Sequence, residues 1–267
     1  MFQKMLSTQR GHRLSLLWQL AKRDIASRYR GSVLGIIWSL MTPLIMLSIY
    51  GFVFSVVFKA RWGQATGAKG EFALILFSGL MVHTFFNECL VRAPTLIFSN
   101  PNFVKKVVFP LELLAPATML SALFHFFVAS IVFWAASILI LGGIKFTILL
   151  LPLMMVPFMI LTLGVMWFLA AFGVYFRDIA QLMGLAGTVL LFMSPILFPS
   201  TMLPEAIRGL IYLNPLSFIV EQVRDVALWG KMPHWAGLGI YTVVASIIYI
   251  MGYWMFQKLK KGFADVI

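Results

Sequence analysis

The sequence predicts an all-α integral membrane protein with six transmembrane helices in a single transmembrane domain, residues 1–267. First, 61% of the residues are hydrophobic and only 11% are charged, whereas a soluble domain carries about 25% charged residues. Second, most of the long uncharged stretches exceed the roughly 20 apolar residues that a helix needs to cross a bilayer. Third, aromatic and branched residues fill these stretches without the alternation of a barrel strand, which favours helices.

The six spans are expected at about residues 32–58, 72–98, 112–141, 147–175, 179–199 and 234–257. In the second span, Glu88 and Arg92 lie four residues apart, so on a helix they are neighbours. Either they pair within the membrane, where a charge needs a partner or a cavity, or the span ends near Asn87 and both lie at the interface. We expect the second arrangement, because the apolar stretch before Glu88 nearly suffices in a tilted or locally thin bilayer.

Residues 1–30 are expected to form a cytoplasmic tail that ends in an amphipathic helix lying on the membrane surface. Its apolar side carries five residues at helical spacing, namely Leu14, Leu17, Trp18, Ala21 and Ile25. Its other sides carry Lys22, Arg23 and Arg28, so the pattern is typical of an interfacial helix. The alternative is a solvated basic tail. A removable signal peptide is not expected, because about thirty mostly polar residues precede an overly long apolar span.

The first span begins with Gly31 and Gly35, which lie one helical turn apart and would let another helix approach closely. Towards its other end, Tyr50, Phe54 and Phe58 recur on every fourth position and share one face. We expect these rings either to line a pathway or to face lipid in the aromatic belt of the interface.

A short segment bounded by prolines, residues 100–110, is expected between the second and third spans. Pro101 and Pro110 interrupt regular structure at its two ends, and Lys105 and Lys106 favour the cytoplasmic side. The residues between the prolines suffice for about two helical turns. The segment is therefore expected either to dock into the cleft of a partner or to form a simple loop.

The fifth span and the segment after it carry two further patterns. Ala180, Gly184 and Thr188 recur at four-residue spacing and form a small-residue face suited to close helix contact. Within residues 204–229, Pro204 and Pro215 each stand where a first helical turn would begin, the second preceded by Asn214 as a cap. This segment is too short to cross and return, so we expect two re-entrant helices beside a pathway opening.

The distribution of basic residues predicts that both termini are cytoplasmic. With six spans, thirteen Lys and Arg residues fall on the side of the N-terminus and seven on the other, which is the bias of cytoplasmic loops. Residues 258–267 then form a cytoplasmic tail. The net charge of +12 is typical of basic loops near anionic lipids, so no nucleic acid partner is expected.

Motifs for catalysis, metals or nucleotides do not occur in the sequence. There is no GxxxxGK[ST] phosphate loop, and the four histidines and one cysteine lack metal-ligand spacing. The nine acidic residues form no proton-relay pattern within a span and no paired set for glycosyl transfer. We therefore expect no catalytic residue, no metal and no cofactor in this chain.

Several stretches together resemble the membrane subunits of type-2 ABC exporters that move lipid-linked polysaccharides, such as O-antigen, capsule and teichoic acid. The matching stretches are RDIASRYRGSVLGIIWSLMTPL at 23–44, NPNFVKKVVFP at 100–110, YFRDIAQ at 175–181, SPILFP at 194–199, NPLSFIVEQVRD at 214–225 and the terminal KGFADVI. Their order and spacing cover nearly the whole chain, and the set is more specific than any one of them.

The resemblance implies a homodimer of this subunit in the bacterial inner membrane with two copies of a separate ATP-binding subunit, which carries ATP and Mg²⁺. It implies a substrate that is a polysaccharide linked to a lipid such as undecaprenyl diphosphate. Contact with the ATP-binding subunit is expected at Trp18, Arg23, Arg28, Arg30, Asn102, Phe103, Lys105 and Lys106. The exit gate is expected at Pro204, Arg208, Asn214, Pro215, Glu221 and Arg224. A path between subunits, lined by the first and fifth spans, would involve Tyr50, Phe54, Phe58, Phe192 and Met193. The small-residue contacts of the dimer are expected at Gly31, Gly35, Ala180, Gly184 and Thr188.

Three alternatives remain open at the level of the sequence. A drug or lipid exporter of the same class would share the architecture and differ in its substrate. An ion-coupled secondary transporter should contain an inverted repeat with broken, charged spans, which the sequence does not display. A membrane enzyme acting on a lipid-linked sugar should gather carboxylates or histidines at one membrane face.

Overall fold

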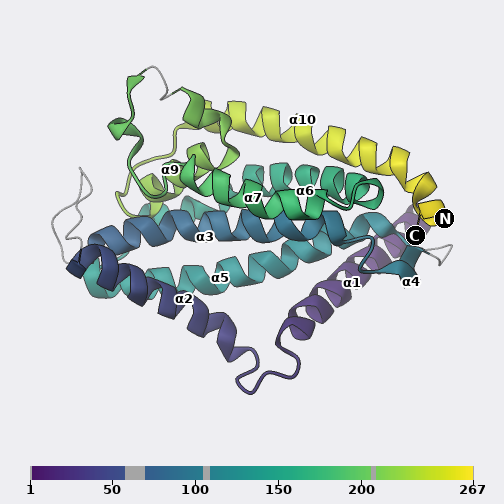
Figure 1. Cartoon of the computed structure of the whole chain (residues 1–267), viewed down its shortest axis with the longest axis horizontal. Helices are drawn as coiled ribbons and strands as arrows, with labels where there is room; N and C mark the ends of the chain where they lie inside the picture. The colour runs from purple at the N-terminus through teal and green to yellow at the C-terminus, as the bar shows by residue number, and fades with distance from the viewer. Residues whose placement is uncertain (1, 58–69, 105–108, 206–208, 267) are drawn as a thin grey trace.

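The structure is a computed structural model that describes residues 2–57, 70–104, 109–205 and 209–266. Every regular element within these ranges is helical, which confirms the all-α prediction. The long helices α3 (Glu71–Arg92), α5 (Leu114–Leu141), α6 (Leu151–Tyr175) and α10 (Trp235–Leu259) run along one another, with the shorter α7 (Ile179–Phe192) beside α3 (Figure 1). Helices α1 (Phe2–Tyr29) and α2 (Ile37–Tyr50) splay apart in a V from the turn that joins them.

The two ends of the molecule carry different parts of the chain. The start of α1, the C-terminal helix and the short α4 (Pro101–Val104) lie at one end, and α9 (Pro215–Ala227) lies towards the other (Figure 1). If the long helices cross a membrane, α4 and α9 therefore lie towards opposite surfaces of it.

Five helical segments of the described chain are long and apolar enough to cross a membrane. They are Ile37–Phe54, Glu71–Thr95, Leu111–Leu141, Phe146–Tyr175 and Trp235–Val266. The sixth predicted span, 179–199, is not confirmed, because α7 ends at Phe192 after 14 residues. Pro195 and Pro199 follow closely. A proline has no backbone N–H to donate, and its ring clashes with the carbonyl group one helical turn earlier.

The first span begins later than predicted. Gly31 and Gly35 have φ angles of +83° and +52° and lie in the turn between α1 and α2. Left-handed backbone of this kind is open to glycine and costly for other residues, so these glycines end one helix and reverse the chain. The prediction that they stack one turn apart on a helix is therefore wrong. After Tyr50 the helix continues as a wider π-helical segment, Gly51–Val57.

The helix of the second span passes Asn87 without a break, and the expected place of Glu88 and Arg92 at the membrane interface stays a prediction. Helix α3 continues to Arg92, and a 3₁₀ turn, Ala93–Thr95, extends it. Glu88 and Arg92 remain helical because α1 and α5 supply partners for both charges, as described below.

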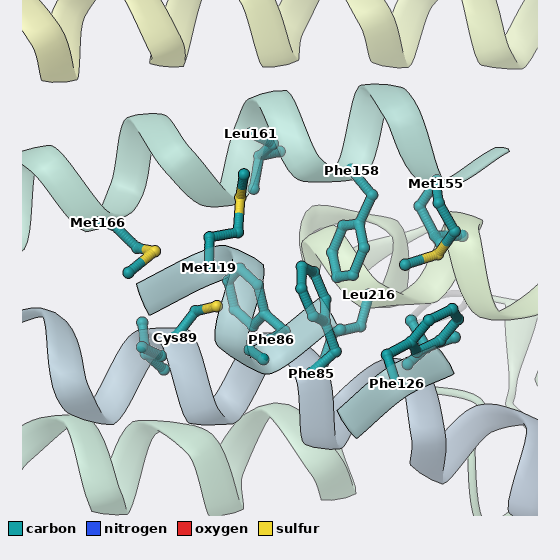
Figure 2. Close-up of a cluster of buried hydrophobic side chains, with 14 of the residues drawn as sticks. Phe85, Phe86, Cys89, Met119, Phe126, Met155, Phe158, Leu161, Met166 and Leu216 are labelled. Carbon is teal, nitrogen blue, oxygen red and sulfur yellow. The ribbon is translucent and has the colours of Figure 1, made fainter. Parts of the chain in front are cut away.

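Helix α3 is the centre of the bundle. Of an 18-residue apolar stretch of this helix, 72% is buried inside the protein, against 6% for the first span and 17% for the last. Figure 2 shows the rings of Phe85, Phe86 and Phe158 gathered between α3 and α6, with Phe126 of α5 and Met155 beside them. Phe86 and Phe158 stack with their centroids 5.5 Å apart. Since lipid is as apolar as these side chains, close packing is what holds such a core together.

The largest helix contact joins α6 and α10, and two glycines make it close. A Cβ atom on Gly164 would lie 2.6 Å from the Cα of Tyr249, and one on Gly252 would overlap the carbonyl oxygen of Gly164. Only glycine fits at such a crossing. The small-residue contact within one chain is thus made by Gly164 and Gly252.

Proline positions predicted three short helices, namely one within 100–110 and two within 204–229, and the structure agrees with them to different degrees. Helix α9 begins at Pro215, as predicted. Among the residues that the structure describes, the first arm of the re-entrant pair contains the 3₁₀ turn Leu210–Leu213, and another 3₁₀ turn, Ser200–Met202, precedes the arm. Helix α4 is a single turn, and residues 105–108 of the predicted two-turn helix lie outside the described ranges.

The C-terminal residues are not a free tail. A 3₁₀ turn, Lys260–Gly262, leads into a last helical turn, α11 (Phe263–Val266). Phe263 is fully buried and contacts the rings of Phe256 and Tyr175. The Nζ atom of Lys260 lies 2.7 Å from Glu112 Oε2, which ties this end to the start of α5.

Candidate functional site

An ion cluster fastens α1 to the bundle, centred on Glu88 of α3. Arg28 Nη1 of α1 lies 2.6 Å from Glu88 Oε1, and Arg92 Nη1 lies 3.3 Å from the same oxygen. Arg92 Nη2 also reaches Asp24 Oδ1 of α1 at 2.5 Å. The Glu88 side chain is 9% exposed, so these partners replace the water that its carboxylate loses. We call Asp24, Arg28, Tyr29, Glu88, Arg92 and His125 the Glu88 cluster.

His125 of α5 completes the Glu88 cluster. Its Nδ1 atom lies 3.1 Å from Glu88 Oε2, and its Nε2 atom lies 2.9 Å from the hydroxyl of Tyr29. With its proton on Nδ1, the ring donates to Glu88 and accepts from Tyr29. Burial raises the pKa of the Tyr29 phenol, so the hydroxyl remains a donor at neutral pH. Helices α1, α3 and α5 thus meet in one polar junction.

This junction has a mechanical consequence. Breaking a buried ion pair by removing one partner is strongly destabilising, because a charge is left without compensation. A displacement of α1 therefore either breaks the Glu88 cluster or moves α3 and α5 with it. The arrangement suits the transmission of a push on α1 into the bundle.

A cavity of about 280 Å³ lies between α1, the end of α3 and α4. Its wall includes Arg23 and Asp24 of α1, Arg92 of α3, and Asn100 and Phe103 beside or within α4. Phe103 stacks on Phe109 at 4.1 Å between centroids. The cavity thus lies between α1 and α4, the described part of the predicted docking segment.

Two of the residues predicted to contact an ATP-binding subunit, Arg23 and Phe103, line this cavity. Trp18, Arg23, Arg30 and Asn102 are exposed, and Phe103 is half-buried. Arg28 is part of the Glu88 cluster, and Lys105 and Lys106 lie outside the described residues. The contact itself stays a prediction.

The predicted apolar stripe of α1 is only partly covered. Ala21 is buried and Leu17 and Ile25 are half-buried, whereas Leu14 and Trp18 are exposed. The Nζ atom of Lys22 lies 5.3 Å from the centre of the Trp18 ring. An exposed indole beside a cation is typical of a membrane surface, so the stripe divides between the bundle and the exterior.

The predicted pathway residues occupy two environments. Tyr50 and Phe54 pack against the core of their own chain, Phe54 stacking on Phe72 with centroids 5.4 Å apart. Phe192 and Met193 are exposed at the end of α7, and Phe58 lies outside the described residues. The structure does not bring the five together on one described surface.

Asn214 does more than the predicted capping. Its Oδ1 atom accepts from the N–H of Leu216 at 2.9 Å, which caps α9. Its amide nitrogen donates to the carbonyls of Leu190 at 2.8 Å and Met193 at 3.1 Å, groups that the last turn of α7 leaves without helical partners. One side chain therefore joins the end of α7 to the start of α9.

Arg224 is buried inside the protein, with 1% of its surface exposed. It donates through Nε to the carbonyl of Ile75 at 3.1 Å, through Nη2 to Ile196 at 2.9 Å, and through Nη1 to Pro195. A Cβ atom on Gly79 would lie 2.9 Å from Arg224 Nη2, so this glycine makes room for the guanidinium. Arg224 was predicted as a gate residue, and the structure anchors it to backbone carbonyls within the bundle; its role in a gate stays a prediction.

The remaining predicted gate residues lie nearer the surface. Pro204 is exposed, Pro215 and Glu221 are half-buried, and Arg208 lies outside the described residues. Glu221 Oε2 accepts a hydrogen bond from the hydroxyl of Tyr212 at 2.9 Å, which links α9 to the 3₁₀ turn before it. Helix α9 is thus fixed by Arg224 and Asn214 beneath a more exposed segment.

The small-residue face of α7 is open. Gly184 and Thr188 are exposed, Ala180 is half-buried, and a Cβ atom on Gly184 would meet nothing within 4 Å. Contact with a second copy at these positions, or at Gly31 and Gly35 in the α1–α2 turn, stays a prediction.

Sequence reasoning missed two features of the structure. His125 and Tyr29 carried no recognisable spacing relative to Glu88, since they come from separate helices. Gly164 and Gly252 had no signal beyond being glycines in apolar spans. Among the described residues, no group of three His, Cys, Asp or Glu side chains is close enough to hold a metal ion.

The chain is similar to curated proteins over nearly its full length. It is 26% identical over 260 residues to the O-antigen export system permease protein RfbA of Klebsiella pneumoniae, covering 96% of each chain. It is 25% identical over 259 residues to RfbA of Myxococcus xanthus, covering 94% of this chain and 95% of the relative. It is 22% identical over 251 residues to the polysialic acid transport protein KpsM of Escherichia coli, covering 90% and 92%.

A family model described as ABC-2 type transporter matches residues 15–228. This match runs from α1 through the Glu88 cluster to the end of α9, and so includes each candidate site described above. The chain therefore belongs to the ABC-2 type transporter membrane family.

Proposed function

We propose that this chain is the membrane-spanning permease of an ATP-driven exporter of lipid-linked polysaccharide. The observation that carries the proposal is its similarity to O-antigen export permeases over 96% of both chains. Similarity of this extent includes the α1–α2 turn, α4 and α9, which are the parts that a generic helical bundle would not share.

The energy for export comes from a separate subunit that binds ATP and Mg²⁺, in two copies per transporter. The lack of a phosphate loop in this sequence supports a separate source. The polar cavity between α1 and α4 supports a docking site there, with Lys105 and Lys106 next to it in the sequence. ATP-driven closure of the partner would push α1, and the Glu88 cluster would pass that movement to α3 and α5.

The polysaccharide passes between two copies of this chain. Helices α2 and α7 have apolar side chains on their exposed faces, including Ile45 and Ile49 of α2 and Leu185 and Val189 of α7. Such faces are suited to contact with a partner or with lipid. Gly184 and Thr188 allow close approach of the second copy. Phe192 and Met193 lie at the end of α7, where exposed rings and thioethers can contact a sliding polymer.

The substrate is a polysaccharide carried on undecaprenyl diphosphate, and the protein spans the bacterial inner membrane with both termini in the cytoplasm. The common end shared by α4 and the two termini (Figure 1) supports that orientation, because α4 adjoins the basic segment. The exposed segment before α9 then lies at the exit.

The test is complementation of a deletion strain. Deleting the gene should abolish surface polysaccharide while lipid-linked polymer accumulates inside the cell, and the wild-type gene should restore the surface polymer. Phe192→Ala should restore it poorly. Phe127→Ala, which shortens an exposed ring of α5, should restore it fully. Normal surface polysaccharide in the deletion strain would contradict the proposal.

A further inference from the structure

A cavity of about 280 Å³ between α1, α2, α3 and α5 has the form of a slot. Its lining along α3 runs from Phe77 to Glu88, and along α2 from Ser39 to Tyr50. The first and last lining residues of each helix are eleven positions apart, which corresponds to about 16 Å along the helix axis. The slot is therefore elongated along the helices that cross the membrane.

The lining of the slot changes from polar to apolar along this length. At the end near the α1–α2 turn, the wall carries Arg28, Tyr29, Glu88 and His125, with the hydroxyls of Ser39 and Thr42. Further along, the lining is mostly apolar, with Thr84 and Tyr50 as its two hydroxyl-bearing members; the apolar residues are Pro43, Met46, Phe77, Leu80, Met81, Phe85, Ala122, Phe126 and Ala129. Such a lining matches an amphiphile with its head at the turn and one hydrocarbon chain between α2 and α3.

The polar end of the slot contains hydrogen-bond donors and acceptors that are available to a bound head group. Arg28 is 46% exposed and uses Nη1 for Glu88. Within the described part of the chain, its Nε and Nη2 atoms have no hydrogen-bond partner, so they can donate to a phosphate. The hydroxyls of Ser39 and Thr42 donate to Ile36 and Trp38 carbonyls, so their oxygens can accept from an ammonium group.

Charge balance selects the kind of head group. In the Glu88 cluster, Arg28 and Arg92 balance Glu88 and Asp24. An uncompensated charge at membrane depth is costly, so a zwitterionic head fits this balance and an anionic one disturbs it. No residue of α2 is buried by the protein itself. The side of α2 that faces the slot is therefore open to a bound molecule.

We propose that the slot holds one zwitterionic phospholipid of the surrounding bilayer, its phosphate on Arg28 and one acyl chain between α2 and α3. The lipid acts as a structural part of the junction between α1, α2 and the bundle. It is distinct from the exported lipid-linked substrate.

The experiment is native mass spectrometry of the full chain, purified in a mild detergent from a bilayer with equal amounts of zwitterionic and anionic phospholipid. The wild-type chain should retain one zwitterionic phospholipid. Ala129→Phe fills the slot and should lose it. Ala135→Phe, which adds the same ring on an exposed position of α5, should retain it.

A second variant leaves the apolar slot intact. Arg28→Gln should lower lipid retention roughly tenfold, the effect of losing one or two charge-assisted hydrogen bonds. Elution as a single species reports folding of each variant. The proposal would be overturned if the wild-type chain retained no lipid, an anionic lipid or a polyprenyl diphosphate. It would also be overturned if Ala129→Phe and Ala135→Phe retained the lipid equally. None of these results depends on transport, so the proposed export function is tested separately.

Discussion

Single side chains decide how the segment after α7 is held. Arg224 reaches three carbonyls of α3 and of the turn after α7, and Asn214 bridges the end of α7 to the start of α9. Such turns leave backbone carbonyls without partners inside the protein, and an unpaired buried carbonyl is costly. The two residues thus make an irregular chain path possible inside the bundle.

Replacing Arg224 by Met should lower the free energy of unfolding by about 3 kcal/mol or more, because three buried carbonyls lose a donor. Chemical denaturation in mixed micelles measures this. Lys231→Met is the matched control, since Lys231 lies 3.6 Å from Asp225 in an exposed pair, and its loss should cost less than about 1 kcal/mol. Equal effects of both changes would mean that Arg224 is not the anchor described here.

Each helix has a distinct task in this fold. α3 is the hub, α6 and α10 form the closest pair, and α1 is attached through ionic contacts more than through apolar burial. Two of these attachments can be tested separately, one made by glycines and the other by charges.

Gly252→Ala should destabilise the α6–α10 pair, because the added Cβ atom overlaps the carbonyl oxygen of Gly164. Gly239→Ala on the same helix meets nothing within 4 Å and should be neutral or stabilising by up to about 1 kcal/mol through helix propensity. Thermal unfolding in detergent compares the two. A stable Gly252→Ala protein would show that the helices are not this close.

Glu88→Ala should release α1 from the bundle, because Arg28 and Arg92 lose their shared carboxylate. Breaking a buried pair costs about 3–5 kcal/mol, so trypsin should cleave α1 at least about tenfold faster. Limited proteolysis followed by mass spectrometry locates the cut. Asp225→Ala removes a carboxylate remote from α1 and should leave the cleavage rate unchanged; acceleration by both variants would indicate general unfolding.

At the scale of the whole molecule, the sequence predicted what depends on long apolar runs. The predicted spans 147–175 and 234–257 lie within a few residues of Phe146–Tyr175 and Trp235–Leu259, because apolar length alone sets such boundaries. The cap by Asn214 was also predictable, because it acts on a residue two positions away.

The parts that were missed depend on residues distant in sequence. Arg224 binds a carbonyl 149 positions earlier, and Arg28 meets a carboxylate 60 positions later. The apolar length of the second span did not predict these contacts, since nothing local reveals that two other helices supply partners. Likewise, Gly31 and Gly35 matched a helix-packing motif, although their backbone angles belong to a turn.

The most direct test reconstitutes the purified chain in vesicles that contain lipid-linked polysaccharide, with or without its ATP-binding subunit, and measures polymer that becomes accessible to a lectin. Polymer should cross only when the ATP-binding subunit and ATP are both present, because the chain supplies a conduit and no phosphate loop. Transport by the chain alone, or an absence of transport by the complete complex with ATP, would contradict the proposal that this chain is the conduit of an exporter powered by another subunit.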